Sequence, residues 1–381
     1  MRSSMANVTS KIAMIDMCLM FSLYFSGFGF LEGVTSLGIN YGQVANNLPP
    51  PDKVLKLLSA LKLTKTRIYD TNPQILTAFA NSNIELLVTV ENAMLVQLMD
   101  PQQVLQWVTT HIKPYFPATR ITGIAVGNEI FTGGDDTLMT YLVPAMVNIH
   151  NALGQLGLDS HIQVSMPISL AVLEQSFPPS AGSFKSEVYS TMSQVLQFLS
   201  NTKAPFWINC YPYFAYNDDP NNISLDYVLF NPNSGMVDPN TNLRYDNMLY
   251  AQVDAVSFAI NRMGYGGILE VLVLETGWPS KGDSHEVGAT IENAAAYNRN
   301  LFRRQLENEG TPLRPKMRLE VHLFALFNED LKPGPTSKRN YGLYHPDGTM
   351  SYNVGLSTRS NTSSTSTASI YLTSSAMKVK P

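Results

Sequence analysis

Two glutamates, Glu129 and Glu275, each follow a short apolar run at the point where a buried strand would end. Glu129 closes the segment Gly-Asn-Glu, and Glu275 opens the segment Glu-Thr-Gly-Trp-Pro-Ser. An acid at the carboxyl end of a parallel strand faces the active-site mouth of an α/β barrel. Two such acids meet the needs of glycosidic-bond hydrolysis, which uses one proton donor and one nucleophile or base. The alternative is that one or both cap a following helix, because acidic residues favour helix amino termini.

The elements that would position these acids form a regular series between Leu37 and Leu356. Longer amphipathic stretches, such as those at 52–58 and 104–108, alternate with eight apolar runs. The runs are Leu37–Tyr41, Thr66–Tyr69, Glu85–Val90, Thr122–Val126, Ile162–Met166, Phe206–Tyr211, Glu270–Leu274 and Glu320–Phe327. Buried strands that alternate with helices indicate parallel βαβ units. Eight units in about 320 residues predict an α/β fold, a (β/α)8 TIM barrel with a single catalytic domain, rather than an open doubly wound sheet.

The alternation of side chains along a strand predicts which way the acids point. Glu129 follows the fourth run and shares a face with Gly123 and Ala125, whose small side chains suit a crowded barrel interior. Glu275 follows the seventh run and shares a face with Val273. We therefore expect both carboxyl groups to point inward, into one pocket at the mouth of the barrel.

Composition limits the other functions that the chain could have. With 381 residues, 44% of them hydrophobic, the chain can bury a large core, and its net charge of -4 argues against nucleic-acid partners. The two cysteines, Cys18 and Cys210, form no disulfide framework. The six histidines lack ligand spacing, so we assign no metal and no cofactor. The sequence implies no protein partner, and we expect a monomer.

The two ends of the chain differ from the barrel region. Basic residues precede an apolar stretch that continues to Leu31, and small residues follow at 34–36, so residues 1–36 are predicted to be a secretory signal. Residues 357–381 are predicted to be a disordered tail, because 13 of the 19 residues at 357–375 are Ser or Thr. An uncleaved amino-terminal anchor and a lipid anchor remain alternatives. Asn222 and Asn361 fit the glycosylation pattern.

Six motifs resemble a known family in its own order. They are Gly-Ile-Asn-Tyr-Gly at 38–42, Arg-Ile-Tyr-Asp at 67–70, Val-Gly-Asn-Glu at 126–129, Tyr-Pro-Tyr-Phe at 211–214, Glu-Thr-Gly-Trp-Pro-Ser at 275–280 and Phe-Asn-Glu-Asp-Leu-Lys-Pro-Gly at 327–334. The chain is similar to the plant glucan endo-1,3-β-glucosidases of glycoside hydrolase family 17. The resemblance implies a retaining barrel hydrolase that cuts internal β-1,3 linkages of a β-1,3-glucan such as callose.

The resemblance also assigns roles to particular residues. It implies that Glu129 is the proton donor and Glu275 the nucleophile. Glu329 and Lys332 match an acidic and basic pair beside the site, and Lys332 would act on the neighbouring carboxylates.

Further residues are expected to bind the sugar. Tyr69 and Tyr211 match pocket residues of the family. Asn128, next to the acid, would bond the sugar 2-hydroxyl. Trp278 and Phe327 lie near strand ends, where stacking on sugar faces is expected, although large barrels also bury many aromatic residues.

Two other functions remain alternatives at this stage. One is a mixed-linkage 1,3;1,4-β-glucanase, because barrels set linkage preference through loops. The other is a non-catalytic β-glucan-binding wall protein that uses the same groove. Binding alone does not require two carboxyl groups close together, so Glu129 and Glu275 favour an enzyme.

Overall fold

The computed structural model describes residues 37–354, 356–358 and 370–372. Its central sheet has the strand order β5-β4-β3-β2-β1-β13-β12-β9-β6. All neighbouring pairs run parallel. The two end strands, β5 and β6, are consecutive pieces of one stretch that Met166 interrupts. The sheet therefore closes on itself with eight strand positions, which confirms the predicted TIM barrel.

Each predicted run supplies one position of the barrel. The strands are β1 (Leu37–Tyr41), β2 (Lys65–Ile68), β3 (Glu85–Val90), β4 (Arg120–Val126), β5 (Gln163–Ser165), β6 (Pro167–Ser169), β9 (Phe206–Asn209), β12 (Val271–Thr276) and β13 (Val321–Leu323). The eighth run was predicted to extend to Phe327, but the strand ends at Leu323. The residues after Leu323 instead form part of the barrel mouth.

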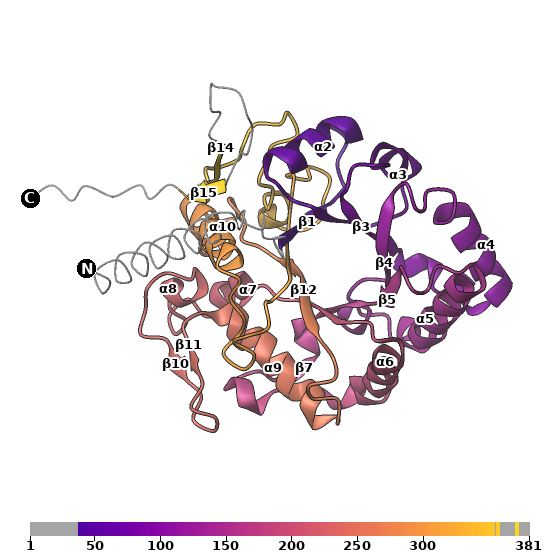
Figure 1. Ribbon diagram of the computed structural model, residues 1–381. Helices are drawn as coiled ribbons and strands as arrows, with labels where there is room; N and C mark the ends of the chain where they lie inside the picture. Colours follow the sequence, from indigo (N-terminus) through magenta and orange to yellow (C-terminus); the bar gives the residue numbers. More distant parts are fainter. Residues whose placement is uncertain (1–36, 355, 359–369, 373–381) are drawn as a thin grey trace, which may run out of the picture. The chain divides into compact units, whose positions relative to one another are not determined.

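Helices surround the strands on the outside of the barrel (Figure 1). The longer ones are α2 (Pro51–Ala60), α4 (Pro101–His111), α5 (Thr137–Gln155), α6 (Tyr189–Thr202), α9 (Met248–Arg262) and α10 (Ile291–Leu306), and the shorter ones are α3 (Pro73–Ala78), α7 (Pro212–Asp218) and α8 (Leu225–Val228). Helices α2, α3, α4 and α7 begin with proline, whose fixed φ and missing N–H suit the first turn. The predicted amphipathic stretches at 52–58 and 104–108 lie in α2 and α4.

The two faces of the sheet belong to different hydrophobic clusters, one outside the barrel and one inside it. The larger cluster packs the helices against the strands and includes Val271 and Val273. A small cluster fills the barrel interior and contains Leu87, Ala125, Trp207, Leu272 and Leu274. The predicted inward face of the fourth strand is thus confirmed at Ala125. The predicted face of the seventh strand was wrong.

A β-bulge explains how Glu275 nevertheless points inward. Val273 pairs with Ile208 of β9, whereas Glu275, two residues later, pairs with the next residue, Asn209. The register with β13 also shifts between Val273 and Thr276. One extra residue in β12 therefore changes the alternation, so that Leu274 and Glu275 both face the interior.

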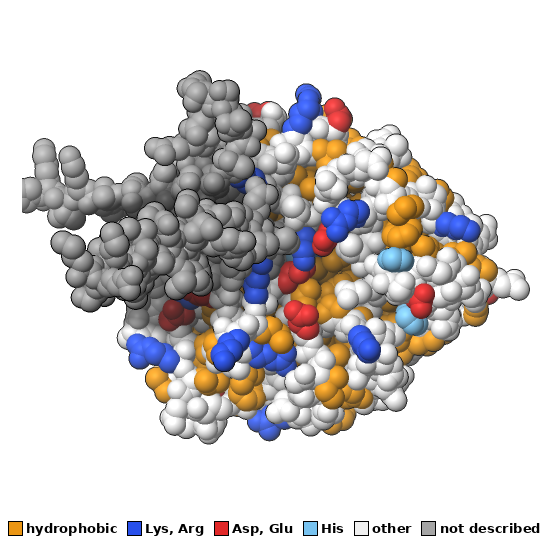
Figure 2. Space-filling view, viewed as in Figure 1, with side chains coloured by type: hydrophobic (Ala, Val, Ile, Leu, Met, Phe, Trp, Pro, Cys, Tyr) orange, Lys and Arg blue, Asp and Glu red, His pale blue; other side chains and the backbone are white. Residues whose placement is uncertain are grey.

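The amino-terminal end of the barrel carries a separate layer of charges. Lys65 forms an ion pair with Glu320 and lies 3.8 Å from Glu85. These residues help to line a cavity of about 650 Å³. A hollow bordered by acidic and basic side chains is visible on the face drawn in Figure 2. Glu129 and Glu275 do not line this cavity.

The predicted ends of the chain fall mostly outside the described residues. Residues 1–36 and Asn361 are among those not described. Two short strands, β14 (Leu356–Thr358) and β15 (Ile370–Leu372), pair antiparallel where no regular structure was predicted. Asn222, the other predicted glycosylation site, is exposed. No helix in the described part of the chain is both long enough and apolar enough to span a membrane.

Gly38 in β1 is a position where the barrel leaves no space for a side chain. A Cβ atom there would lie 2.5 Å from the ring of His322, which is buried. The Gly38→Ala variant should lose about 1–3 kcal/mol in the free energy of unfolding, because the added methyl group would overlap the buried ring of His322. Urea denaturation would measure this loss.

The control for this prediction is Gly154→Ala in α5, where a Cβ atom has no neighbour closer than 3.8 Å. That variant should be neutral or more stable, because alanine favours a helix. Adding His322→Ala to Gly38→Ala should restore part of the lost stability. Equal stability of the two glycine variants would contradict the proposed packing.

Candidate active site

Glu129 reaches the barrel mouth through two left-handed residues. β4 ends at Val126, and Gly127 and Glu129 then adopt φ values of 71° and 52°. Positive φ is ordinary for glycine but uncommon for glutamate. A Cβ atom at Gly127 would also lie 2.5 Å from Ile130. The direction of the Glu129 side chain is therefore set by this turn, and the simple alternation of the strand does not extend to it.

Hydrogen bonds from neighbouring loops hold the turn in place. Asn92 bonds the backbone of Asn128 on both sides, with its amide nitrogen donating at 3.0 Å and its amide oxygen accepting at 2.7 Å. The Glu129 N–H donates to the Pro167 carbonyl at 2.9 Å. The Glu129 side chain makes no cap hydrogen bond to the short helix that follows. Its Oε1 instead accepts a hydrogen bond from Asn209 at 2.9 Å.

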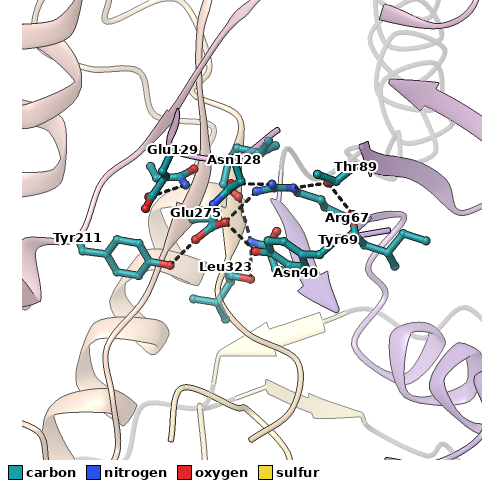
Figure 3. A network of polar contacts seen from close by, with 12 residues as sticks. Asn40, Arg67, Tyr69, Thr89, Asn128, Glu129, Tyr211, Glu275 and Leu323 are labelled. Atoms are coloured by element: carbon teal, nitrogen blue, oxygen red, sulfur yellow. Dashed lines mark hydrogen bonds and ion pairs between the residues drawn. The ribbon is translucent and has the colours of Figure 1, made fainter. Parts of the chain in front are cut away.

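Glu275 lies at the centre of a polar network (Figure 3). Its Oε1 accepts from Arg67 at 2.8 Å and from the Tyr69 hydroxyl at 2.7 Å, and its Oε2 accepts from the Tyr211 hydroxyl at 2.8 Å. Glu275 is 6% exposed and Arg67 is completely buried. Arg67 also donates to the side-chain oxygen of Asn128 at 2.8 Å. Three donors thus satisfy the charged form of the Glu275 carboxyl.

The two tyrosines can only donate in this network. Burial and the charge of Glu275 raise the pKa of Tyr69 and of Tyr211 well above the usual value for tyrosine. Both hydroxyls therefore keep their protons and donate hydrogen bonds to Glu275. The predicted pocket residues Tyr69 and Tyr211 are thus placed around the predicted nucleophile, and both side chains are partly exposed.

Glu129 has a different electrostatic environment. Burial raises its pKa, and the charge of Glu275 raises it further. The hydrogen bond from Asn209 and the positive charges of Arg67 and Lys338 act in the opposite direction. The net effect raises the pKa of Glu129, and a raised carboxyl pKa next to a second carboxyl group is the arrangement that acid-assisted cleavage uses.

Glu329 and Lys332 form the predicted pair, but protein groups already bond both carboxylate oxygens of Glu329. Glu329 is 2% exposed, and its oxygens bond the Val44 N–H at 3.0 Å and the Lys332 ammonium at 3.1 Å. Its carboxyl lies against Gly42, where a Cβ atom would be 2.3 Å away. Glu329 therefore joins the loops after β1 and β13. Lys332 lies 4.0 Å from the ring centre of Phe324.

Two of the predicted sugar-binding aromatics are core residues, so these predictions were wrong. Trp278 is fully buried, and its indole N–H donates to the Gly288 carbonyl at 2.8 Å. Phe327 is 1% exposed and packs edge-on against Tyr41. Neither ring offers a face to a substrate. Phe324, which the sequence analysis did not assign, packs edge-on against both Tyr69 and Tyr211.

The chain matches a known protein family over most of its length. Residues 37–356 match the family described as Glycosyl hydrolases family 17. The chain belongs to this glycoside hydrolase family.

Several known proteins are similar to this chain in sequence or structure. The chain is 49% identical over 323 residues to glucan endo-1,3-beta-glucosidase 11 of Arabidopsis thaliana, a match that covers 84% of this chain and 76% of that protein. It is 50% identical to glucan endo-1,3-beta-glucosidase 14 of Arabidopsis thaliana, over 84% of this chain and 82% of that protein. A solved β-1,3-glucanase and pollen allergen of Cryptomeria japonica has 42% identity and a TM-score of 0.80, with coverage of 84% and 98%.

Sequence reasoning missed two polar residues of this family 17 site. Arg67 lies in the Arg-Ile-Tyr-Asp motif at 67–70, and Asn209 lies in the apolar run at 206–211, but neither residue was assigned a role. A charged residue within an apolar strand was an available signal for Arg67, because a buried arginine needs a charged partner. Asn209 gave no comparable signal.

The Arg67–Glu275 pair generates a stability prediction. Arg67→Met should lower the free energy of unfolding by about 3–5 kcal/mol, because it leaves the buried Glu275 carboxylate without its cation. Adding Glu275→Gln should recover most of the loss, since the charge is then gone as well. Chemical denaturation of the single and double variants measures both effects.

The matched control is Arg120→Met, which breaks the pair between Arg120 and Glu85, whose side chains are 50% and 29% exposed. Its loss should be less than about 1 kcal/mol. If Arg67→Met were no more destabilising than this control, the buried pair would not have the importance that we assign to it.

Proposed function

We propose that the protein is a retaining endo-hydrolase of 1,3-β-D-glucosidic linkages in β-1,3-glucans, with Glu129 as acid and base and Glu275 as nucleophile. The observation that carries this proposal is the contrast between the two carboxyl groups. Three donors surround Glu275, whereas the pKa of Glu129 is raised by burial and by the charge of Glu275. Hydrolysis with retention needs one ionised and one protonated carboxyl.

The reaction would proceed in two steps. An oxygen of Glu275 bonds to the anomeric carbon while the glycosidic bond breaks, and the proton of Glu129 moves to the leaving oxygen. Glu129, now ionised, takes a proton from water as the water oxygen displaces Glu275 from the sugar. Loss of the Glu275 charge in the intermediate lowers the pKa of Glu129, which suits this change of role.

The linkage assignment rests on the relatives. The Arabidopsis proteins and the Cryptomeria protein are named as enzymes of 1,3-β-glucans. The side chain of Asn128 is partly exposed, and its oxygen accepts a hydrogen bond from Arg67 at 2.8 Å, which leaves its amide N–H groups as candidates for a contact with the sugar. We propose that Asn128 donates to the sugar 2-hydroxyl, together with contacts from Tyr69 and Tyr211.

A mixed-linkage glucanase remains a second candidate. One similar solved structure belongs to a pair of plant β-glucan endohydrolases with distinct substrate specificities. It is 36% identical to this chain, with a TM-score of 0.76 and coverage of 83% of this chain and 99% of that chain. The same fold therefore accompanies more than one specificity. Product analysis on laminarin and on mixed-linkage glucan decides between them, and cleavage of only the mixed polymer would reject our linkage assignment.

We also propose that the protein is secreted and acts outside the cell as a monomer, on a polysaccharide. The predicted signal at 1–36 supports secretion. Sequencing the amino terminus of the protein from the culture medium would test this, with Leu37 as the expected first residue.

Substitution of Glu275 and substitution of Glu129 should reduce activity in different ways. Glu275→Gln should abolish turnover without unfolding the barrel, because an amide cannot form the glycosyl intermediate. Glu129→Gln should spare the first step for an activated aryl glucoside, whose leaving group needs no proton, and should lose about 10²–10⁴-fold on laminarin. Steady-state and burst kinetics measure both effects. An equal loss on the two substrates would contradict the role of Glu129.

Stereochemistry tests the nucleophile independently. The first sugar product from laminari-oligosaccharides should keep the β configuration, and transglycosylation should occur at high oligosaccharide concentration. Proton NMR of the nascent anomeric signal measures the configuration. An initial α product would overturn the nucleophilic role of Glu275, even if both glutamates were essential.

A further inference from the structure

Asn209 is the side chain that bonds the catalytic acid, and it lies in register with the nucleophile. It ends β9, where its backbone pairs with Glu275 of β12 on one side and with Ser169 of β6 on the other. Its side chain is 2% exposed and points into the barrel, where its amide nitrogen donates to Oε1 of Glu129 at 2.9 Å. A rigid, buried strand residue therefore holds one oxygen of the acid.

The remaining polar atoms of the two side chains, the amide oxygen of Asn209 and Oε2 of Glu129, have no hydrogen-bond partner among the described residues. The amide oxygen of Asn209 is buried and has no hydrogen-bond partner among the described residues. Among the described residues, Glu129 is therefore the side chain that hydrogen-bonds this amide. No described residue donates to Oε2 of Glu129, the second oxygen of the acid. The two carboxyl oxygens of Glu129 therefore differ, because one meets a donor and the other is left for the substrate.

An N–H donor has a direct consequence for the position of a proton. A carboxyl oxygen that already accepts an N–H hydrogen bond is a poor place for an acidic proton, because two hydrogens would then face each other. We propose that Asn209 is a positioning residue that keeps the proton of Glu129 on Oε2 and then stabilises the carboxylate formed when that proton leaves. The inference rests on the proposed acid role of Glu129, and it adds which of its two oxygens delivers the proton.

The charges around Glu129 do not provide this selection by themselves. Glu275 of β12, Arg67 of β2 and Lys338 of the loop after β13 act on Glu129 through their charge, without a hydrogen bond to it. Such long-range effects change how readily the carboxyl ionises, but they do not distinguish its two oxygens as a direct hydrogen bond does. Asn209 is the described side chain that makes this direct contact.

Two substitutions separate the functions of the amide. Asn209→Leu keeps the approximate size and removes the donor, so the alkaline limb of the kcat/KM profile should rise by about one pH unit. Asn209→Asp keeps the shape and replaces the donor with an acceptor, which draws the proton to Oε1. We expect Asn209→Asp to lose about 100-fold on laminari-oligosaccharides but less than about tenfold on a dinitrophenyl β-glucoside.

The matched control is Asn92→Leu, which removes an asparagine that bonds the backbone of the same turn and not the carboxyl of Glu129. This variant should slow both substrates equally and leave the alkaline limb in place. The same behaviour in Asn209→Leu and Asn209→Asp would show that Asn209 only packs the site, and would overturn the proposal. Should Asn209→Leu fail to fold, Asn209→Ser keeps a shorter donor and should shift the limb by less than the full unit.

A titration separates this inference from the proposed function. Carbon-13 NMR of side-chain carboxyls, with Glu129→Gln to assign the signal, gives the pKa of Glu129 whether or not the enzyme turns over. Asn209→Leu should raise this pKa above its value in the unaltered protein. An unchanged pKa would overturn the inference about Asn209, whereas a protein that titrates as expected but hydrolyses no glucan would overturn only the proposed function.

Discussion

A carboxylate that is 6% exposed must be neutralised, and the surroundings of Glu275 are organised by this requirement. An unpaired charge at such a depth would cost several kcal/mol. Arg67, itself completely buried, supplies the cation at 2.8 Å, and two tyrosine hydroxyls supply the other donors. These partners come from β2 and β9, on either side of the barrel mouth. The β-bulge of β12 is what turns Glu275 toward them.

The charge of Glu275 also determines the state of its neighbour. One arginine contacts Glu275, and no cation contacts Glu129 within hydrogen-bond distance among the described residues. Glu129 therefore lies in a half-buried position near a negative charge without a cation of its own, and its pKa rises. The lack of a directly bonded cation therefore contributes to the raised pKa of Glu129, together with burial and the charge of Glu275. In the mechanism that we propose, the charge of Glu275 is lost in the glycosyl intermediate, and this cause of the raised pKa is lost with it.

The barrel could be predicted from the sequence, because parallel strands buried on both faces give apolar runs that are visible one at a time. The direction of Glu275 was predicted correctly for a wrong reason. The bulge between Val273 and Glu275 is a relation among three strands, and no local pattern within the seventh run encodes it. The predictions for Trp278 and Phe327 were wrong for a similar reason, since a position near a strand end does not say whether a ring faces the mouth or the helices. Asn209 was missed because an asparagine near a strand end is common.

The two ends of the barrel show why only one of them is suited to catalysis. At the amino-terminal end, Lys65 is shared between Glu320 and Glu85, and Arg120 also pairs with Glu85, so opposite charges meet directly. Protonating one of those acids would break an ion pair. At the mouth, Glu129 is held by a neutral amide, so it can gain or lose a proton without losing a cation. Such a neutral partner suits the role that we propose for Glu129, which is acid in one step and base in the next.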